Sequence, residues 1–144
     1  MTTDAPLQHG RTGHVGRIHF NRPEALNAID AATAQAFEAA CSVLAADKEV
    51  RAVVLSAAGR AFDAGGDVKS FVTDPGAVVS TLIEPMHRAL LMLASLSAPI
   101  IASVGGAAAG AGFSLAMASD LLIASSPRKF GHCAAMKACR LRAT

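Results

Sequence analysis

Aromatic side chains are scarce in this chain, which has six Phe and neither Trp nor Tyr. Single-stranded nucleic acids are held largely by stacking on aromatic rings, so this scarcity argues against stacking-based nucleic-acid binding. Alanine and glycine are abundant instead, and 52% of the 144 residues are apolar. These proportions exclude a disordered chain and predict one domain with a core of small side chains and close backbone approaches.

Cysteine is rare as well. Cys41, Cys133 and Cys139 form an odd set without the spacing of a disulfide framework, and the N-terminus lacks the basic and apolar segments of a signal peptide. We therefore expect a reduced, cytoplasmic protein. His132, Cys133 and Cys139 do not have the spacing of a closed zinc site, so no metal is expected.

Long uninterrupted apolar runs are also missing. The most apolar stretch, residues 98–118, is broken by glycines and favours a strand, a loop and a helix over a membrane span. Acidic residues do not occur after Asp120, whereas five of the thirteen Lys and Arg residues lie in the last seventeen positions. A basic tail can bind nucleic acid or an anionic surface. Here we expect a solvated end, with neither a nucleic-acid nor a membrane partner.

Apolar periodicity predicts alternating strands and helices, with no linker that would divide the chain. Residues 1–13 are expected to fray or form an edge strand, and Asp30 is suited to cap a helix. The β-branched run 51–56 is typical of a strand buried on both faces of a parallel sheet. Pro85 must kink its helix or mark its first turn. The predicted strands are 14–20, 51–56, 99–104 and 121–124, and the predicted helices are 30–46, 77–96 and 111–119. This order predicts an α/β fold with mostly parallel pairing.

Two glycine-rich stretches carry most of the chemical information: AFDAGGDV at 61–68 and VGGAAAGAG at 104–112. Each is expected to end a strand and open a helix, so each can leave backbone N–H groups uncovered. Two such groups that converge on one carbonyl oxygen form an oxyanion hole. A helix that begins near Ala111 would add the positive end of its dipole.

Other kinds of site fit these stretches less well. GFSLA at 112–116 nearly matches a nucleophile elbow, which makes a serine hydrolase using Ser114 the rival enzyme, but Ser114 is expected inside a helix rather than on the turn that an elbow requires. The dinucleotide fingerprint and the phosphate-binding lysine motif are both incomplete. Asp67 is expected to cap the following helix, and Glu84 is a weak candidate for an acid near the site.

Four motifs, taken together, resemble the crotonase (enoyl-CoA hydratase/isomerase) superfamily in order and spacing over about residues 14–131. They are NRPEALNA at 21–28, GRAFDAGGDV at 59–68, GGAAAGAG at 105–112 and ASDL at 118–121. The resemblance implies an α/β, crotonase-like (ClpP/crotonase) spiral of repeated strand-strand-helix units, with its C-terminal part missing. It divides the chain into a core domain, 1–131, and a basic tail, 132–144, without the family pattern.

The resemblance also implies acyl-CoA thioester chemistry, in which two backbone amides stabilise an enolate-like state for hydration or double-bond isomerisation. Coenzyme A is then part of the substrate, and no further cofactor is implied. Carried over by position, the oxyanion-hole N–H groups belong to Gly66 and Ala111. The residues expected to line the CoA moiety are Ala25, Leu26, Ala64, Asp67, Val68 and Gly110.

This chain departs from the family's hydratases at both carboxylates that transfer protons. Ser114 and Ala134 stand where those enzymes carry glutamates, although the first is also lost in isomerase-type members. A truncation or frameshift after about Gly131 would remove the elements that cover the site and build the family's trimer or hexamer. The competing hypothesis is therefore a catalytically inactive fragment with exposed apolar surface.

Overall fold

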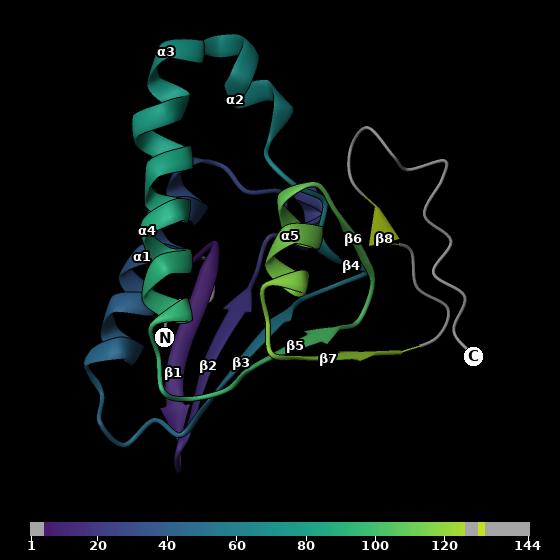
Figure 1. The fold of residues 1–144 in the computed structure, drawn as a ribbon. Coiled ribbons are helices and arrows are strands. Elements are labelled where there is room, and N and C mark those ends of the chain that lie inside the picture. Colours follow the sequence, from purple (N-terminus) through teal and green to yellow (C-terminus); the bar gives the residue numbers. More distant parts are fainter. Residues whose placement is uncertain (1–4, 126–129, 132–144) are drawn as a thin grey trace.

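The computed structural model describes residues 5–125 and 130–131. Five strands form the larger sheet, in the order β1-β2-β3-β5-β7 (Figure 1). The first pair is antiparallel and the remaining pairs are parallel. The strands are β1 (Leu7–Thr12), β2 (Val15–Phe20), β3 (Ala52–Ala57), β5 (Ile100–Val104) and β7 (Leu121–Ala124). The parallel core of this sheet confirms the predicted α/β class.

A second, smaller sheet consists of three short parallel strands in the order β4-β6-β8. They are β4 (Ala61–Asp63), β6 (Ala107–Ala109) and β8 (Phe130–Gly131). Along the chain, each strand of the larger sheet from β3 onward is followed by one of the smaller sheet, and helices separate these pairs. This alternation is the repeated strand-strand-helix unit that the family resemblance implies.

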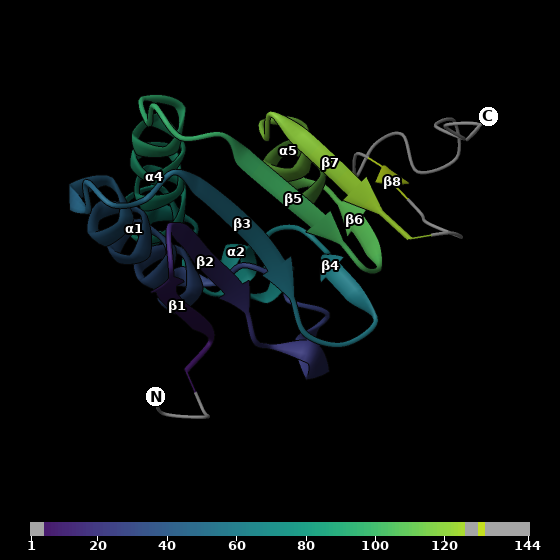
Figure 2. The same cartoon turned by 90° about the horizontal axis from the view of Figure 1, so that it is seen from below.

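Helices α1 (Ala31–Ala46) and α4 (Glu84–Ala94) lie side by side on one face of the larger sheet, as Figures 1 and 2 show. The predicted cap is present, because the Asp30 carboxylate accepts the Thr33 N–H at 2.8 Å. The rings of Phe20 and Phe37, 5.6 Å apart, join β2 to α1. A small cavity of about 40 Å³ lies between α4 and α5 (Ala111–Met117), so α5 covers the same face of the sheet.

The predicted helix 77–96 is one continuous helical run with a change of winding. It contains α3 (Pro75–Val78), the π-helical segment η2 (Val79–Ile83) and α4, and Pro85 lies in the first turn of α4. By length and composition alone, the run Pro75–Ala94 could cross a membrane. Its buried residues Val78, Leu82, Met86, Ala89 and Leu93 belong to the main hydrophobic core. These residues recur at intervals of three and four, which is the pattern of an amphipathic helix that packs one face on the core.

The structure corrects the sequence prediction in three places. Strand β3 is not buried on both faces, because Val53 and Leu55 are fully buried whereas Val54 is only half-buried. Short strands β4 and β6 lie inside the glycine-rich stretches, which were expected to be loops. The helical segment η1 (Pro23–Ala25) was not predicted, and the helix expected after Asp67 is the short α2 (Val68–Thr73).

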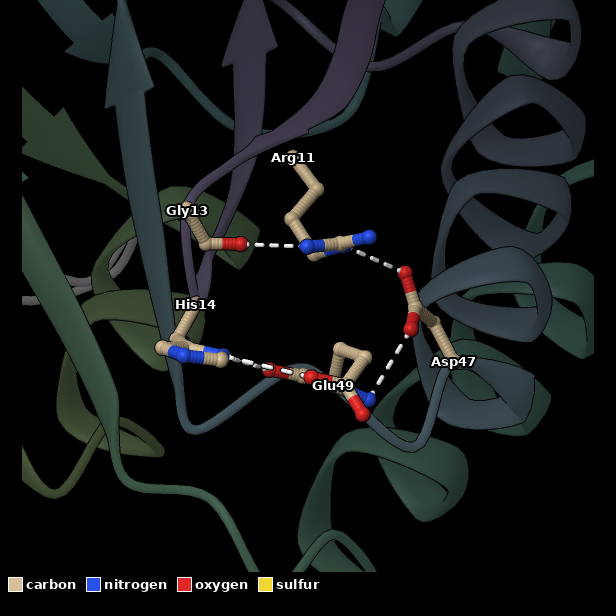
Figure 3. A network of polar contacts seen from close by, with 5 residues as sticks. All are labelled: Arg11, Gly13, His14, Asp47 and Glu49. Carbon is tan, nitrogen blue, oxygen red and sulfur yellow. Dashed lines mark hydrogen bonds and ion pairs between the residues drawn. The ribbon is translucent and has the colours of Figure 1, made fainter.

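A polar network at the end of the sheet ties the β1–β2 turn to the segment between α1 and β3 (Figure 3). Arg11 Nε donates to Asp47 Oδ2 at 2.7 Å, and Arg11 also donates to the Gly13 carbonyl. The Glu49 N–H donates to Asp47 Oδ1 at 3.0 Å, while His14 Nδ1 lies 2.9 Å from the Glu49 carbonyl oxygen. The Glu49 N–H, followed by Arg11, holds the pKa of Asp47 below its usual value.

Strand β7 exposes a run of apolar side chains, with Leu121, Leu122 and Ile123 between 41% and 62% exposed. An exposed apolar edge strand favours pairing with other chains. We predict that Ile123→Lys lowers self-association, because a charge on the strand opposes such pairing. Light scattering over a range of concentrations measures the effect. Val43→Lys, on the exposed face of α1, adds the same charge elsewhere, and an equal effect of both variants would show that β7 is not responsible.

Gly106 brings the chain before β6 against the chain before β4. A Cβ at this position would lie 2.1 Å from the Arg60 carbonyl oxygen, whereas a Cβ at Gly105 would meet nothing within 4 Å. We predict that Gly106→Ala lowers the free energy of unfolding by about 2–3 kcal/mol, because the backbone at Arg60 must move. Gly105→Ala should change it by less than about 0.5 kcal/mol. Urea denaturation of both variants tests this, and equal losses would contradict the close approach.

Candidate functional site

The two glycine-rich loops touch each other through their backbones. Gly65 has φ +100°, and a Cβ built on it would lie 3.2 Å from the Ala109 carbonyl oxygen and 3.5 Å from the Ala111 nitrogen. A Cβ on Gly110, which has φ +53°, would lie 3.4 Å from the Gly65 Cα. Glycine at both positions permits these conformations and this approach. The structure therefore brings the neighbours Gly66 and Ala111, predicted from separate motifs, to one place.

The backbone N–H groups of Gly66 and Ala111 lie outside the hydrogen bonding of the strands and helices around them. Gly66 forms a parallel bridge with Ile29, in which the hydrogen bonds are made by the Gly65 carbonyl and the Asp67 N–H, both at 2.8 Å. The N–H of Gly66 itself then points away from Ile29. Ala111 is the first residue of α5, where N–H groups lack helical partners. Neither N–H donates a hydrogen bond within the described part of the chain.

The NRPEALNA segment completes the site from a third direction. Leu26 and Asn27 adopt left-handed backbone conformations, and the Leu26 carbonyl accepts the Ala64 N–H at 3.1 Å. The buried Asn27 side chain holds this turn: it donates to the Ala58 and Ala61 carbonyls, each at 2.8 Å. It also accepts the Arg22 N–H at 2.8 Å. Such a satisfied buried amide fixes the backbone on which Ala25 and Leu26 are carried.

The structure places the predicted site residues as follows. Leu26 and Ala64 are hydrogen-bonded neighbours, and Gly110 lies against Gly65. Asp67 Oδ1 accepts the Lys69 N–H at 3.1 Å, so Asp67 caps the start of α2 as predicted. Val68 begins α2 and is 69% exposed. Ala134 and the predicted tail 132–144 lie outside the described residues.

The positions of Ser114 and Glu84 limit the roles that these two predicted side chains can have. Ser114 lies within α5, where its hydroxyl donates to the Gly110 carbonyl at 3.3 Å, rather than on a strand-to-helix turn. The Glu84 carboxylate is exposed at the start of α4 and lies 3.7 Å from the Arg88 guanidinium. Among residues 5–125, no group of three or more His, Cys, Asp and Glu side chains is arranged to hold a metal ion.

Sequence reasoning missed two residues beside Gly66 and Ala111. Phe71 on α2 places its ring over Gly66, where an added Cβ would lie 2.9 Å from the ring. No signal identified Phe71, because the helix expected after Asp67 was predicted without bounds or contacts. Asp63 lies within the first glycine-rich stretch and was given no role, yet its side chain is fully buried at the end of β4. Burial raises the pKa of Asp63 to about 7, although the Gly65 N–H lowers it.

A groove of about 630 Å³ lies away from these loops, between the outer faces of α1 and α4. Its lining includes the ion pair of Arg88 and Glu38, and both side chains are partly exposed. The Arg88 guanidinium lowers the pKa of Glu38. Because surface ion pairs of this kind are common, the groove has no chemistry comparable to the two unpaired amides.

Comparisons with known proteins agree with the geometry. The family model for enoyl-CoA hydratase/isomerase matches residues 10–137. A probable enoyl-CoA hydratase of Rhizobium meliloti is 40% identical over 125 residues, which cover 83% of this chain and 46% of that protein. A probable mitochondrial enoyl-CoA hydratase of Dictyostelium discoideum is 35% identical over 124 residues, with 85% and 43% covered.

A solved enoyl-CoA hydratase structure from Mycobacterium smegmatis superposes with a TM-score of 0.81 at 37% identity. The match covers 87% of this chain and 49% of that one. This chain thus spans a little under half the length of the curated relatives it matches. These likenesses agree with the alternation of the two sheets along the chain and with the contact between the glycine loops. The chain therefore belongs to the enoyl-CoA hydratase/isomerase family and has a crotonase-type α/β fold.

Proposed function

We propose that this chain binds an acyl-CoA thioester and stabilises its enolate through the backbone N–H groups of Gly66 and Ala111. The observation that carries the proposal is the contact between Gly65 and Gly110, which brings two unpaired amides together. A thioester oxygen that accepts both hydrogen bonds gains negative charge as the α-proton leaves. Donors that are fixed beforehand stabilise this charge more than they stabilise the neutral thioester.

The neighbouring backbone supports binding of the rest of the substrate. Ala25, Leu26 and Ala64 lie on two segments that are hydrogen-bonded to each other beside Gly66. We propose that they contact the CoA moiety mainly through backbone atoms, together with Asp67, Val68 and Gly110. The Phe71 ring is partly exposed over Gly66 and offers an apolar wall for the acyl chain.

Proton transfer needs a group that can reach the substrate, and the carboxyl that the described residues place beside the amides, Asp63, is fully buried. Ser114 replaces one family carboxylate, and its hydroxyl donates back to its own helix. Hydration requires an activated water, and isomerisation requires a base that carries the proton between carbons. We infer that residues 5–125 polarise the thioester, while turnover depends on parts of the family fold outside them. A fragment that binds without turnover is the alternative.

The remaining expectations belong to the same proposal. The substrate is the acyl-CoA thioester itself, so no metal or redox cofactor takes part in the proposed step. We propose a cytoplasmic location from the cysteine pattern and the composition of the N-terminus, and a trimer or hexamer from the family resemblance.

The sharpest test removes one backbone N–H rather than a functional side chain. We predict that Ala111→Pro lowers the bound enolate fraction of a β-ketoacyl-CoA by on the order of 10- to 100-fold, because one of two donors is lost. Proline is well suited to the first position of a helix, so α5 should persist. The enolate is measured by its near-ultraviolet absorbance in a titration with protein.

Ala111→Ser is the matched control, since it changes the side chain but keeps the N–H. It should retain the enolate signal. An equal signal in Ala111→Pro, with circular dichroism showing an intact fold, would contradict the assignment of Ala111. A wild-type protein that binds no acyl-CoA would contradict the proposed function as a whole.

A further inference from the structure

The Asp63 carboxyl lies between the two loops that supply the amides. Its Oδ1 accepts the Gly65 N–H at 2.7 Å, next to Gly66 in the first loop. Its Cγ would lie 2.7 Å from a Cβ built on Gly112, which follows Ala111 in the second loop. The side chain is fully buried, and Oδ2 has no hydrogen-bond partner among the described residues. One carboxyl therefore contacts both halves of the proposed oxyanion hole.

The surroundings of Asp63 contain almost no charge. The strands β3 and β6 and the helix α5, which pack against β4, carry no titratable side chain. On its own segment, Arg60 is exposed and Asp67 accepts the Lys69 N–H. Arg22 and Asp30, on the adjoining turn, pair with each other at 3.0 Å. Burial without a compensating cation raises the pKa of Asp63 to about 7.

We propose that Asp63 is a positioning residue whose neutral form is required for the two loops to accept a negatively charged oxygen. This inference rests on the proposed function. A neutral carboxyl still accepts the Gly65 N–H and holds the Gly65–Gly66 turn. An ionised carboxyl places negative charge in a dry site beneath the amides, where it opposes the charge that they are meant to stabilise. The unpartnered Oδ2 makes the ionised form costlier still.

The direction of the pH effect follows from the raised pKa. Between the ordinary value of 3.8 and about 7, the folded protein holds a proton that the unfolded chain has lost. Stability should therefore fall as the pH rises through this window and level off above it. The binding of an anionic oxygen should fall near the upper end of the same window, where Asp63 ionises in the folded state.

The first measurement uses the wild-type protein and needs no variant. The ¹⁵N–¹H resonances of Gly66 and Ala111 are followed over the neutral pH range. Both should shift together with one midpoint near pH 7. Asp63→Asn, which keeps an oxygen for the Gly65 N–H but cannot ionise, should abolish this transition. Asp67→Asn, in the same loop, should leave it in place. The proposal is overturned when either amide of the wild-type protein shows no transition.

The second measurement compares a β-ketoacyl-CoA bound to the protein with the same compound free in solution at the same pH. The quantity followed is the enolate fraction of the bound compound divided by the enolate fraction of the free compound. In the wild-type protein it should fall about tenfold per pH unit above the midpoint, and in Asp63→Asn it should stay constant. Identical pH profiles for the two proteins would overturn the proposal. If the wild-type protein binds no thioester at any pH, the proposed function fails, and the amide titration still decides whether Asp63 acts on both loops.

Discussion

The close backbone contact between the two glycine loops is the constraint on which the site depends. Four glycines make it possible: Gly65 and Gly110 adopt positive φ, while Gly106 and Gly112 leave room for Arg60 and Asp63. A single methyl group at Gly106 or Gly112 would overlap the neighbouring chain at distances well below van der Waals contact. The loops can therefore meet only where side chains are missing, and Gly66 and Ala111 lie near each other as a consequence of that packing.

Two neighbouring residues of β4 connect this contact to the core. Phe62 is fully buried, and its ring lies 6.2 Å from the Phe20 ring of the larger sheet. Asp63, the next residue, contacts Gly112 of the second glycine loop. One three-residue strand thus anchors the smaller sheet to the core with one side chain and fixes the glycine loops with the next. Rigid strands then hold what would otherwise be two flexible loops.

Local signals predicted those parts of the fold that local chemistry determines. The Asp30 cap, the β-branched run of β3 and the position of Pro85 each act within a few residues, and the structure contains all three features. The strands β4 and β6 depend on pairing between distant segments, and their alanines have little intrinsic preference for strands. The choice of Gly66 and Ala111 came from the family resemblance. The burial of Asp63 and the cover from Phe71 arise only from tertiary packing.

A site made of backbone amides responds to mutation differently from one made of side chains. On the proposed function, a Ser at position 114 in place of the family's carboxylate would remove a means of moving protons and would leave the Ala111 N–H in place, because α5 begins at Ala111. Binding and polarisation of a thioester can therefore be kept while the proton transfer changes or is lost. The same reasoning gives Asp63 its importance. With the donors fixed in the main chain, a side chain can influence the charge on a bound oxygen through its own charge or by moving the loops, and Asp63 is placed to do both.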